Sequence, residues 1–455
     1  MPTARIFLVN KRIVDSHLVC LGAVYLPSKI TAFVLLIVLI STPMSAATEK
    51  MLFSFSSPDT AGADPVGNLI RDAAGNLYGA TNLGGPENVG TVFELSPNGS
   101  RWTQTVLYSF PNQTVGYAPS GGLVMDKSGN LYGVTQFGGL HGYGTVYRLT
   151  PDGQGNWTET ILKNFQSTSS RDGSEPFGTL TLDPAGNVYG STIFGGQLGK
   201  SCGQGCGVVF ELSPKKSGSW KYKVLHRFGG FRRGDGQTPT GSLALDGTGN
   251  LFGTTITGGS KGWGMVFELS PGATGWSETI LHNFQGAPVD GAQPPDGMVF
   301  DSSGNLYGLT TAGGVLNDNC PYGCGTVYEL SPNGGGWTES VLYSFSGGSD
   351  GAFPGCLYKG CGTPYGAIVT LQDGNIYGTA SFGGNAPAYS GDGVVFELSP
   401  SGDQWMEQVL HTFTSSPDGQ LPLGGVVFDG NGNLYGTTVN GGKGTNDGIV
   451  YEVSP

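Results

Sequence analysis

The polar and apolar positions of this chain repeat with a period of roughly sixty residues, which indicates an array of similar units. The most regular segment reads Asn-Leu-Tyr-Gly-x-Thr-x-x-Gly-Gly, as in residues 76–85. The same segment begins again at Asn130, Asn187, Asn250, Asn305, Asn375 and Asn433. A unit of this size buries its apolar face only by stacking on its neighbours, so the repeat determines the architecture.

Each unit contains four segments with the pattern of a β-strand. The first is short and apolar, as in residues 122–125, and the second is Asn-Leu-Tyr-Gly-x-Thr. The third reads Gly-Thr-Val-Phe-Glu-Leu-Ser-Pro, as in residues 90–97, and the fourth runs from Trp102 to Phe110 in its first copy. Runs of β-branched and aromatic residues bounded by Gly, Pro, Asn and Asp predict strands.

An Asp-x-x-Gly-Asn turn joins the first two segments, as in Asp72 to Asn76. Asp accepts a hydrogen bond from its own backbone two residues on, and Gly-Asn tolerates the left-handed backbone of a tight hairpin. The sixth unit departs from the frame, with Leu371 in place of the Asp and Asp373 two residues later. A calcium loop would need more carboxylates, so we predict a hairpin.

The first three segments occur seven times, whereas the Trp-led fourth occurs six times. The last unit ends after its third segment, and the missing strand is matched by residues 51–55, which resemble residues 106–110. A chain that takes its last strand from its own start closes a ring, which covers exposed sheet edges. We therefore predict an all-β fold, a seven-bladed β-propeller of four-stranded antiparallel blades. It forms one domain over residues 48–455, with Leu52 beside Val450.

Residues 1–47 differ from the repeats. Lys29 precedes an apolar run at residues 30–40, and small residues follow at 45–47. This order is typical of a secretory signal, and the run falls short of the ~20 residues that span a bilayer. We expect a signal peptide or an N-terminal signal anchor, and hence a secreted, periplasmic or cell-surface protein.

Removing residues 1–47 takes four basic and one acidic residue from totals of 22 and 34, which leaves a net charge near −15. Such a surface repels phosphate backbones, so a nucleic acid is not an expected partner. We expect membrane contact only through an uncleaved N-terminal segment, and a monomer.

The remaining cysteines form close pairs: Cys202 with Cys206, Cys320 with Cys324, and Cys356 with Cys361. An even number in an exported chain predicts disulfides. The alternative, a zinc–thiolate site, would need two pairs to converge near histidines. A disulfide around so small a loop contributes only about 2 kcal/mol, so these bonds would stiffen loops.

Five of the seven loops between the fourth strand and the next unit contain Asp-Gly-x-x-Pro. Their aspartates are Asp172, Asp235, Asp290, Asp350 and Asp418. Ala61 and Val115 stand at the matching place in units one and two. One interpretation is a turn in which Asp accepts backbone hydrogen bonds. The other is a partial ring of carboxylates at the channel mouth, which would make these five residues ligand-binding, for sugar hydroxyls or a cation such as calcium.

Catalytic motifs are missing: no nucleophile elbow, phosphate loop or metal-binding His pair occurs. His226, His282 and His411 occupy one fourth-strand position, which indicates a structural role. The recurrent Glu of the third segment, as in Glu94, is expected to bond to a neighbouring blade, because a charge in mid-sheet is not buried unpaired. The recurrent Trp is expected to pack between blades. We expect no catalytic residue, no metal and no cofactor other than the calcium considered above.

The sequence of Tyr-Gly-x-Thr-x-x-Gly-Gly followed by Gly-Thr-Val-Phe-Glu-Leu-Ser-Pro resembles the GloVer tandem repeat of exported bacterial proteins with a choice of C-terminal anchor. The resemblance covers about residues 51–455, and the Asp-x-x-Gly-Asn turn is also similar to that of NHL-type propellers. It implies export and a propeller-like fold, and it brings no established activity. The chain ends at Pro455 without a sorting tail, so we do not expect the family's surface anchor.

In antiparallel blades, the loops from strand two to three and from strand four to the next blade share one face. These loops hold nearly all the length variation, and variable loops on a rigid scaffold normally carry specificity. We predict a non-catalytic propeller that binds an extracellular glycan or protein through this face. The alternative is a polysaccharide lyase or hydrolase acting at the channel mouth, which convergent acids with an Arg or Lys in a deep central pocket would favour.

Overall fold

The computed structural model describes residues 47–455, except residues 57–60, 201, 357–365 and 367. The chain divides into two units, Met1–Ser45 and Ala46–Pro455. Apart from its last residue, the predicted signal segment lies outside the described residues. In the part that the structure describes, no helix has the length and hydropathy to cross a membrane.

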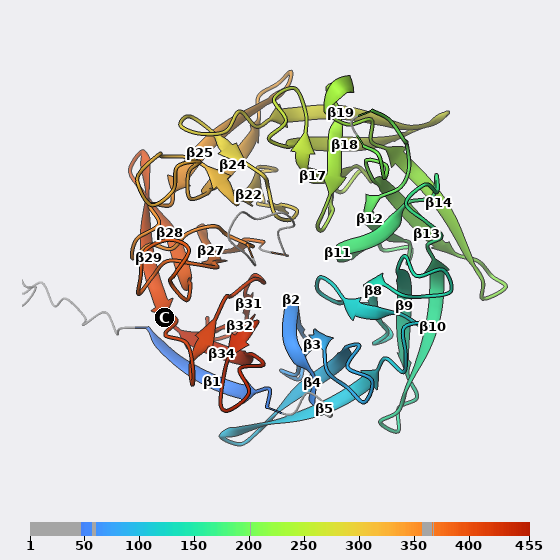
Figure 1. The fold of residues 1–455 in the computed structure, drawn as a ribbon, viewed down its shortest axis with the longest axis horizontal. Helices are drawn as coiled ribbons and strands as arrows, with labels where there is room; N and C mark the ends of the chain where they lie inside the picture. The colour runs from blue at the N-terminus through green and yellow to red at the C-terminus, as the bar shows by residue number, and fades with distance from the viewer. Residues whose placement is uncertain (1–46, 57–60, 201, 357–365, 367) are drawn as a thin grey trace, which may run out of the picture. The chain divides into compact units, whose positions relative to one another are not determined.

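The repeats fold into seven four-stranded antiparallel sheets that stand around a common centre (Figure 1), which confirms the predicted propeller. The innermost strands are β2 (Ala63–Arg71), β6 and β7 (Tyr117–Pro119, Val124–Met125), β11 (Ser174–Leu182), β15 and β16 (Gly236–Pro239, Ala244–Leu245), β20 and β21 (Gly291–Ala292, Val299–Phe300), β26 (Thr370–Gln372), and β30 and β31 (Gly419–Gln420, Val427–Phe428). The second strands are β3 (Leu77–Leu83), β8 (Leu131–Phe137), β12 (Val188–Phe194), β17 (Leu251–Gly258), β22 and β23 (Leu306–Thr310, Ala312–Gly313), β27 (Asn375–Ala380), and β32 and β33 (Leu434–Thr438, Asn440–Gly441).

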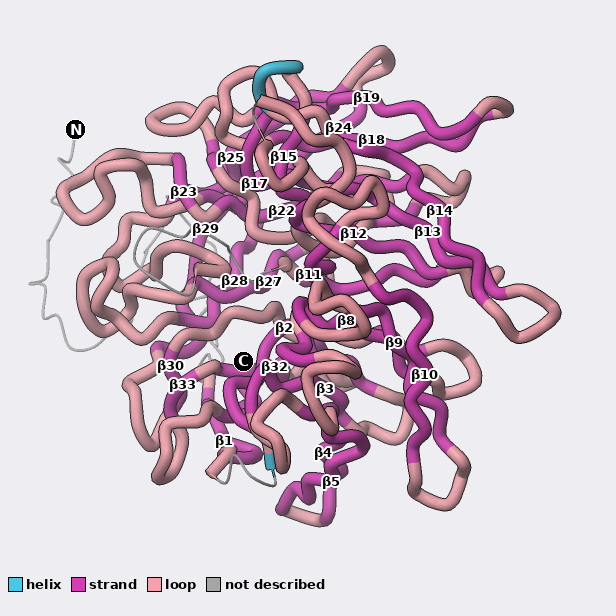
Figure 2. Tube along the Cα trace, turned by 45° about the vertical axis from the view of Figure 1, so that its right-hand side comes forward, coloured by secondary structure: helices cyan, strands magenta, loops and turns pink. Residues whose placement is uncertain are grey.

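The third strands are β4 (Thr91–Asn98), β9 (Thr145–Pro151), β13 (Val208–Pro214), β18 (Met265–Gly272), β24 (Thr326–Pro332), β28 (Val394–Ser401) and β34 (Ile449–Ser454). The fourth, outermost strands are β5 (Arg101–Ser109), β10 (Trp157–Asn164), β14 (Trp220–Arg227), β19 (Gly275–Asn283), β25 (Trp337–Ser344), β29 (Gln404–Thr412) and β1 (Thr48–Ser54). A single-turn 3₁₀ helix, η1 (Phe231–Arg233), precedes β15. Figure 2 shows the hairpins β9–β10 and β13–β14 projecting on one side and the loops around β23, β30 and β33 on the other.

The N-terminal strand completes the seventh blade, as predicted. Strand β1 pairs antiparallel with β34, from Thr48 opposite Ser454 to Ser54 opposite Ile449, and Phe53 lies opposite Val450. The pairing covers the edge that β34 would otherwise expose. Head and tail of the described chain are therefore neighbours in one ring.

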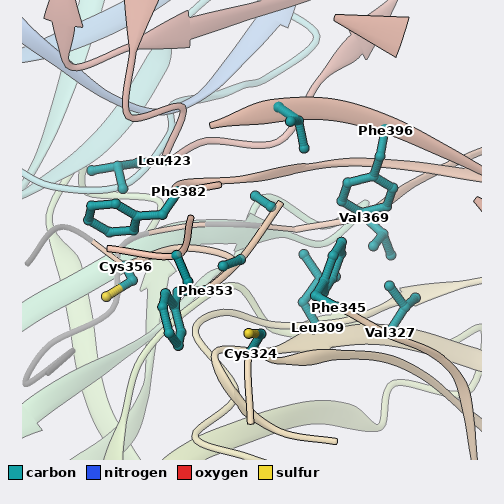
Figure 3. Packing of buried hydrophobic residues seen from close by; sticks show 14 of the residues in the cluster. Leu309, Cys324, Val327, Phe345, Phe353, Cys356, Val369, Phe382, Phe396 and Leu423 are labelled. Atoms are coloured by element: carbon teal, nitrogen blue, oxygen red, sulfur yellow. The ribbon is translucent and has the colours of Figure 1, made fainter. Parts of the chain in front are cut away.

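An aromatic pair joins each blade to the next. The Phe that directly follows each fourth strand is fully buried and packs against the aromatic residue of the next blade's third strand, with ring centroids between 5.1 and 5.7 Å apart. The pairs are Phe55–Phe93, Phe110–Tyr147, Phe165–Phe210, Phe228–Phe267, Phe284–Tyr328, Phe345–Phe396 and Phe413–Tyr451. Figure 3 shows Phe345 and Phe396 in the cluster between blades five and six, beside Leu309, Val327 and Val369.

Other repeated residues have the roles expected of them, with one exception. Asp72 accepts hydrogen bonds from the amides of Ala74 and Asn76, which confirms the hairpin turn. Trp102 packs on Tyr435 of the neighbouring blade, which confirms an inter-blade position for the Trp.

The expectation that the third-strand Glu bonds to a neighbouring blade is wrong. The Glu carboxylate instead accepts hydrogen bonds from side chains of its own blade, because Ser and Tyr hydroxyls on the same face of the sheet are nearer. Examples are Ser96 to Glu94, Ser213 to Glu211, Ser270 to Glu268 and Tyr307 to Glu329.

Glycines surround the axis where the first strands meet. A Cβ on Gly178 would lie 2.5 Å from the Gly241 Cα, and a Cβ on Gly121 would lie 2.3 Å from the Gly178 carbonyl carbon. No side chain fits between the backbones, so glycine permits the blades to approach.

We predict that Gly178→Ala destabilises the protein by about 3 kcal/mol, because the methyl group overlaps the next blade's backbone and φ is positive. The matched control is Gly249→Ala, which has a similar φ (92° against 84°) but nothing within 4 Å of the added Cβ. The control should lose only about 1 kcal/mol, from backbone strain alone. Urea unfolding measures both, and equal losses would show that the close approach is not tight.

Candidate functional site

The aspartates of the five Asp-Gly-x-x-Pro loops lie where the chain leaves one blade and enters the next. Asp290 is 2% exposed and accepts hydrogen bonds from the amides of Gln285 and Gly291, at 2.8 and 2.6 Å. Similar backbone hydrogen bonds are accepted by Asp235, Asp350 and Asp418. These carboxylates thus close turns, and their binding of an external ligand stays a prediction.

Each aspartate also meets the side chain that stands two residues before the buried Phe of the preceding fourth strand. The pairs, with the distance between their polar atoms, are Lys163–Asp172 (3.3 Å), His226–Asp235 (3.8 Å), His282–Asp290 (2.9 Å), Tyr343–Asp350 (3.0 Å) and His411–Asp418 (3.2 Å). A β-bulge immediately precedes this side chain, and such bulges re-aim side chains out of the ladder.

The next blade supplies a third polar side chain from its own fourth strand. It is Glu159, Glu278, Glu339, Glu407 or Glu49 in five cases, and Gln104 or Tyr222 in the other two. We call this cluster of three residues at the junction of two neighbouring blades a seam, and the ring has seven. A seam consists of the side chain two residues before the buried Phe, the loop residue at the place of the aspartate, and the third side chain from the next blade. Where the loop residue is Ala61, the fourth-strand residue is Phe53, and Gln104 donates to the Ala61 carbonyl oxygen at 2.6 Å.

The seams perturb the acidity of their carboxyl groups. Burial raises the pKa of Glu278 to about 7; His226 opposes this rise and Asp235 adds to it. Burial likewise raises the pKa of Glu339 and of Glu407 to about 7, and the neighbouring aspartate of each adds to the effect. Burial alone would also raise the pKa of Asp235, but the nearby His226 imidazole and hydrogen bonds from the amides of Gly229 and Gly236 outweigh it and lower that pKa.

Three seams combine one imidazole with two carboxylates. The groups are His226, Asp235 and Glu278; His282, Asp290 and Glu339; and His411, Asp418 and Glu49. In each group the polar atoms lie within 4.8 Å of one another. Such sets can exchange a proton or coordinate a cation.

The loop face carries a separate, aromatic site over blades four to six. A cavity of about 230 Å³ is lined by Trp263, Tyr322, Phe353 and Tyr389, together with Gln293 and other polar or small residues. A second cavity of about 130 Å³ shares Trp263 and Tyr322. We call the two cavities together the aromatic groove. Trp263 is 38% and Tyr322 70% exposed.

A disulfide supports the groove. Cys320 and Cys324 are bonded, with Cα atoms 5.3 Å apart, and Tyr322 stands between them in the loop. Cys202 and Cys206 form the second predicted disulfide. Cys356 is buried and also disulfide-bonded, whereas its predicted partner Cys361 lies outside the described residues.

A further cavity, of about 370 Å³, lies among the first strands at the centre of the ring. Its lining residues, which include Asn68, Leu69, Phe300, Val369 and Val427, carry no ionisable side chain among those described. The convergent acids and base that would indicate an enzyme are therefore not found in this lining.

Comparison with known families decides the identity of the repeat. The sequence profile of the Gloeobacter/Verrucomicrobia repeat family matches residues 38–246 and residues 199–451. The chain belongs to this family. None of the curated proteins matches it.

Solved structures resemble this Gloeobacter/Verrucomicrobia repeat protein in fold only. Virginiamycin B lyase from Staphylococcus aureus is 13% identical, with a TM-score of 0.51, and the match covers 90% of this chain and 99% of the lyase. A PL25 ulvan lyase is 12% identical with a TM-score of 0.49 over 89% of this chain and 95% of its own. A crystal structure described as that of a putative 6-phosphogluconolactonase from Bacteroides uniformis is 13% identical, with a TM-score of 0.47 over 80% of this chain and 95% of its own.

Two sets of residues in the Gloeobacter/Verrucomicrobia repeat protein were not found from its sequence. Four seam glutamates follow a motif Trp by two residues, as Glu159 follows Trp157, and this repeated spacing could have indicated them. The groove residues Trp263, Tyr322 and Tyr389 stand in loops that differ between units, so no periodic signal indicates them.

We predict that Glu159→Gln changes how the stability of this family member depends on pH. Folding raises the pKa of Glu159 from 4.5 to about 7 through burial, although Tyr108 opposes the rise by donating a hydrogen bond. The stabilisation is therefore complete below pH 4.5 and is lost as the pH rises through 7. Gln stays neutral, so the variant should match the natural protein near pH 5 and exceed it by about 1 kcal/mol near pH 8, after allowance for partial exposure.

Urea unfolding at both pH values measures the difference. Glu87→Gln, on an exposed turn, is the control for loss of one negative charge. A Gln is tolerated at this place in a seam, since Gln104 occupies it in the seam of Ala61. Identical pH dependence in Glu159→Gln and Glu87→Gln would contradict the prediction.

Proposed function

We propose that this protein is an exported, non-catalytic propeller that binds a glycan in the aromatic groove. The observation that carries the proposal is the exposure of Trp263 and Tyr322 at the junction of two adjoining cavities. An exposed aromatic pair costs solubility unless it serves binding. Two adjoining cavities suit a chain of sugar units better than one compact molecule.

The chemistry of the groove matches a sugar. Trp and Tyr rings provide flat apolar faces with a polar edge, which suit a ring that is apolar on its face and polar at its rim. No described residue hydrogen-bonds to the Gln293 side-chain amide, so this amide is free to bind a hydroxyl group. No Asp, Glu, Lys, Arg or His lines either cavity, which favours an uncharged stretch of glycan.

The groove is held ready for its ligand. The Cys320–Cys324 disulfide restricts the loop that presents Tyr322, and restricting a loop in its bound form lowers the entropy cost of binding. Tyr389 has a positive φ of 72°, a strained backbone for a residue with a side chain. Its ring packs on Phe353, with centroids 4.4 Å apart.

Export is part of the proposal. Disulfides persist in oxidising compartments, and the charged, apolar and small-residue order of residues 1–47 is typical of a secretory signal. The alternative, cleavage of a polysaccharide at the channel mouth, has less support because the central cavity has no ionisable lining residue among those described. Protein partners at the same loop face stay the second binding alternative.

We predict that a glycan array with the natural protein gives at least one oligosaccharide ligand. Tyr322→Ala should weaken the binding of that oligosaccharide at least about tenfold, because aromatic contacts that become buried on binding dominate the binding energy. Tyr322 is exposed, so its loss should leave the fold intact. Tyr143→Ala is the matched control, because Tyr143 holds in blade two the loop position of Trp263 and lies outside the groove.

The double variant Cys320→Ser, Cys324→Ser should also bind the oligosaccharide more weakly, without changing which oligosaccharide is preferred. Incubation with the same oligosaccharide should release no new reducing ends; their release would favour the alternative enzyme. An array without any ligand, or equal affinity in Tyr322→Ala and Tyr143→Ala, would refute glycan binding in the groove.

A further inference from the structure

One of the seven seams differs from the other two histidine seams, because its histidine lies close to both carboxylates and is hydrogen-bonded to neither. His226 Nε2 lies 3.8 Å from Asp235 Oδ2 and 3.5 Å from Glu278 Oε1, and both distances exceed those of ordinary hydrogen bonds. Of the three seam histidines, only His226 has a buried Nε2 without a hydrogen-bond partner among the described residues. Glu278 Oε1 is also unpartnered, as is one oxygen of the seam glutamate in the other four seams that have one. Buried polar atoms are normally paired, so this convergence calls for an occupant.

The equivalent seams show what a closed arrangement looks like. Tyr343 donates to Asp350 at 3.0 Å, and His282 and His411 lie within hydrogen-bond distance of Asp290 and Asp418. In those seams the loop carboxylate bonds directly to the fourth-strand side chain. The His226 seam has the same backbone frame with a gap between its polar atoms.

We call the His226 seam the open seam. Its three atoms His226 Nε2, Asp235 Oδ2 and Glu278 Oε1 form a suitable ligand set for a transition metal. Zinc binds imidazole nitrogen and carboxylate oxygen at about 2.0–2.2 Å, which places neighbouring ligands of a tetrahedral site about 3.3 Å apart. The observed 3.5 and 3.8 Å therefore need a closure of only a few tenths of an ångström. Two carboxylates also neutralise a divalent charge.

The surroundings hold the ligands and leave an entrance. The amide of Gly236 donates to Asp235 Oδ1 at 2.6 Å, and the ring of Phe228 packs edge-on against His226. Such supporting contacts orient metal ligands. The side chains of His226, Asp235 and Glu278 are 16–19% exposed, so water can complete the coordination sphere.

We propose that His226, Asp235 and Glu278 bind one divalent transition metal ion of the Zn²⁺ class across the junction between blades three and four. The metal would bridge adjacent blades, since His226 belongs to β14 and Glu278 to β19. This proposal is independent of glycan binding, because the aromatic groove lies over blades four to six and shares no residue with the seam. It departs from the expectation, drawn from the sequence, of no metal.

The test is a titration of tag-free, chelator-treated protein with Zn²⁺ by calorimetry and with Co²⁺ by visible absorption. His226→Tyr is the decisive variant, because Tyr343 occupies the same position in the seam between blades five and six and the fold accepts it there. His282→Tyr and His411→Tyr are matched controls. Circular dichroism and thermal unfolding check that all three variants fold.

We expect the natural protein to bind at least one equivalent of Zn²⁺ and to give a Co²⁺ spectrum of low coordination number. His226→Tyr should lose one equivalent, and Glu278→Gln should weaken the same equivalent, whereas both controls retain it. Two outcomes would overturn the proposal: no Zn²⁺ binding by the natural protein, or a folded His226→Tyr variant with the full stoichiometry.

Discussion

The ring depends on one contact that is made at every junction: the buried Phe that directly follows a fourth strand packs against the aromatic residue of the next blade's third strand. Such pairs contribute about 0.5–1.5 kcal/mol beyond the area they bury. Seven of them in a closed ring leave no blade with an unmatched aromatic. The N-terminal strand is therefore part of the constraint, since Phe55 makes this contact with Phe93 across the point of closure.

Beside each constant aromatic contact lies a variable polar one. The same seam position holds His, Tyr, Lys or Phe in different blades, and the loop residue after it changes from Asp to Val or Ala. The aromatic pair keeps the blades in register, so the seam can change its chemistry without changing the fold. This explains how one repeated frame contains closed hydrogen-bonded seams and the open seam at His226.

The loop face is a second place where chemistry varies on a fixed frame. Blades four, five and six contribute loops to the aromatic groove, and the Cys320–Cys324 disulfide closes the loop of blade five that carries Tyr322. Neither the seams nor the groove lies at the axis, where glycine backbones pack closely and the central cavity has no ionisable side chain among its described lining residues.

The sequence by itself determined the number of blades, the four strands in each, the turns and the completion of the last blade by residues 51–55, because these features recur at fixed offsets. It also indicated both confirmed disulfides and the inter-blade Trp. Only the tertiary structure decided that Glu278 of one blade approaches His226 and Asp235 of another, and that Trp263, Tyr322 and Tyr389 share a groove. A periodic sequence pattern shows only the features that all units share. Contacts between units, and between loops that differ, depend on how far neighbouring sheets are rotated about the axis.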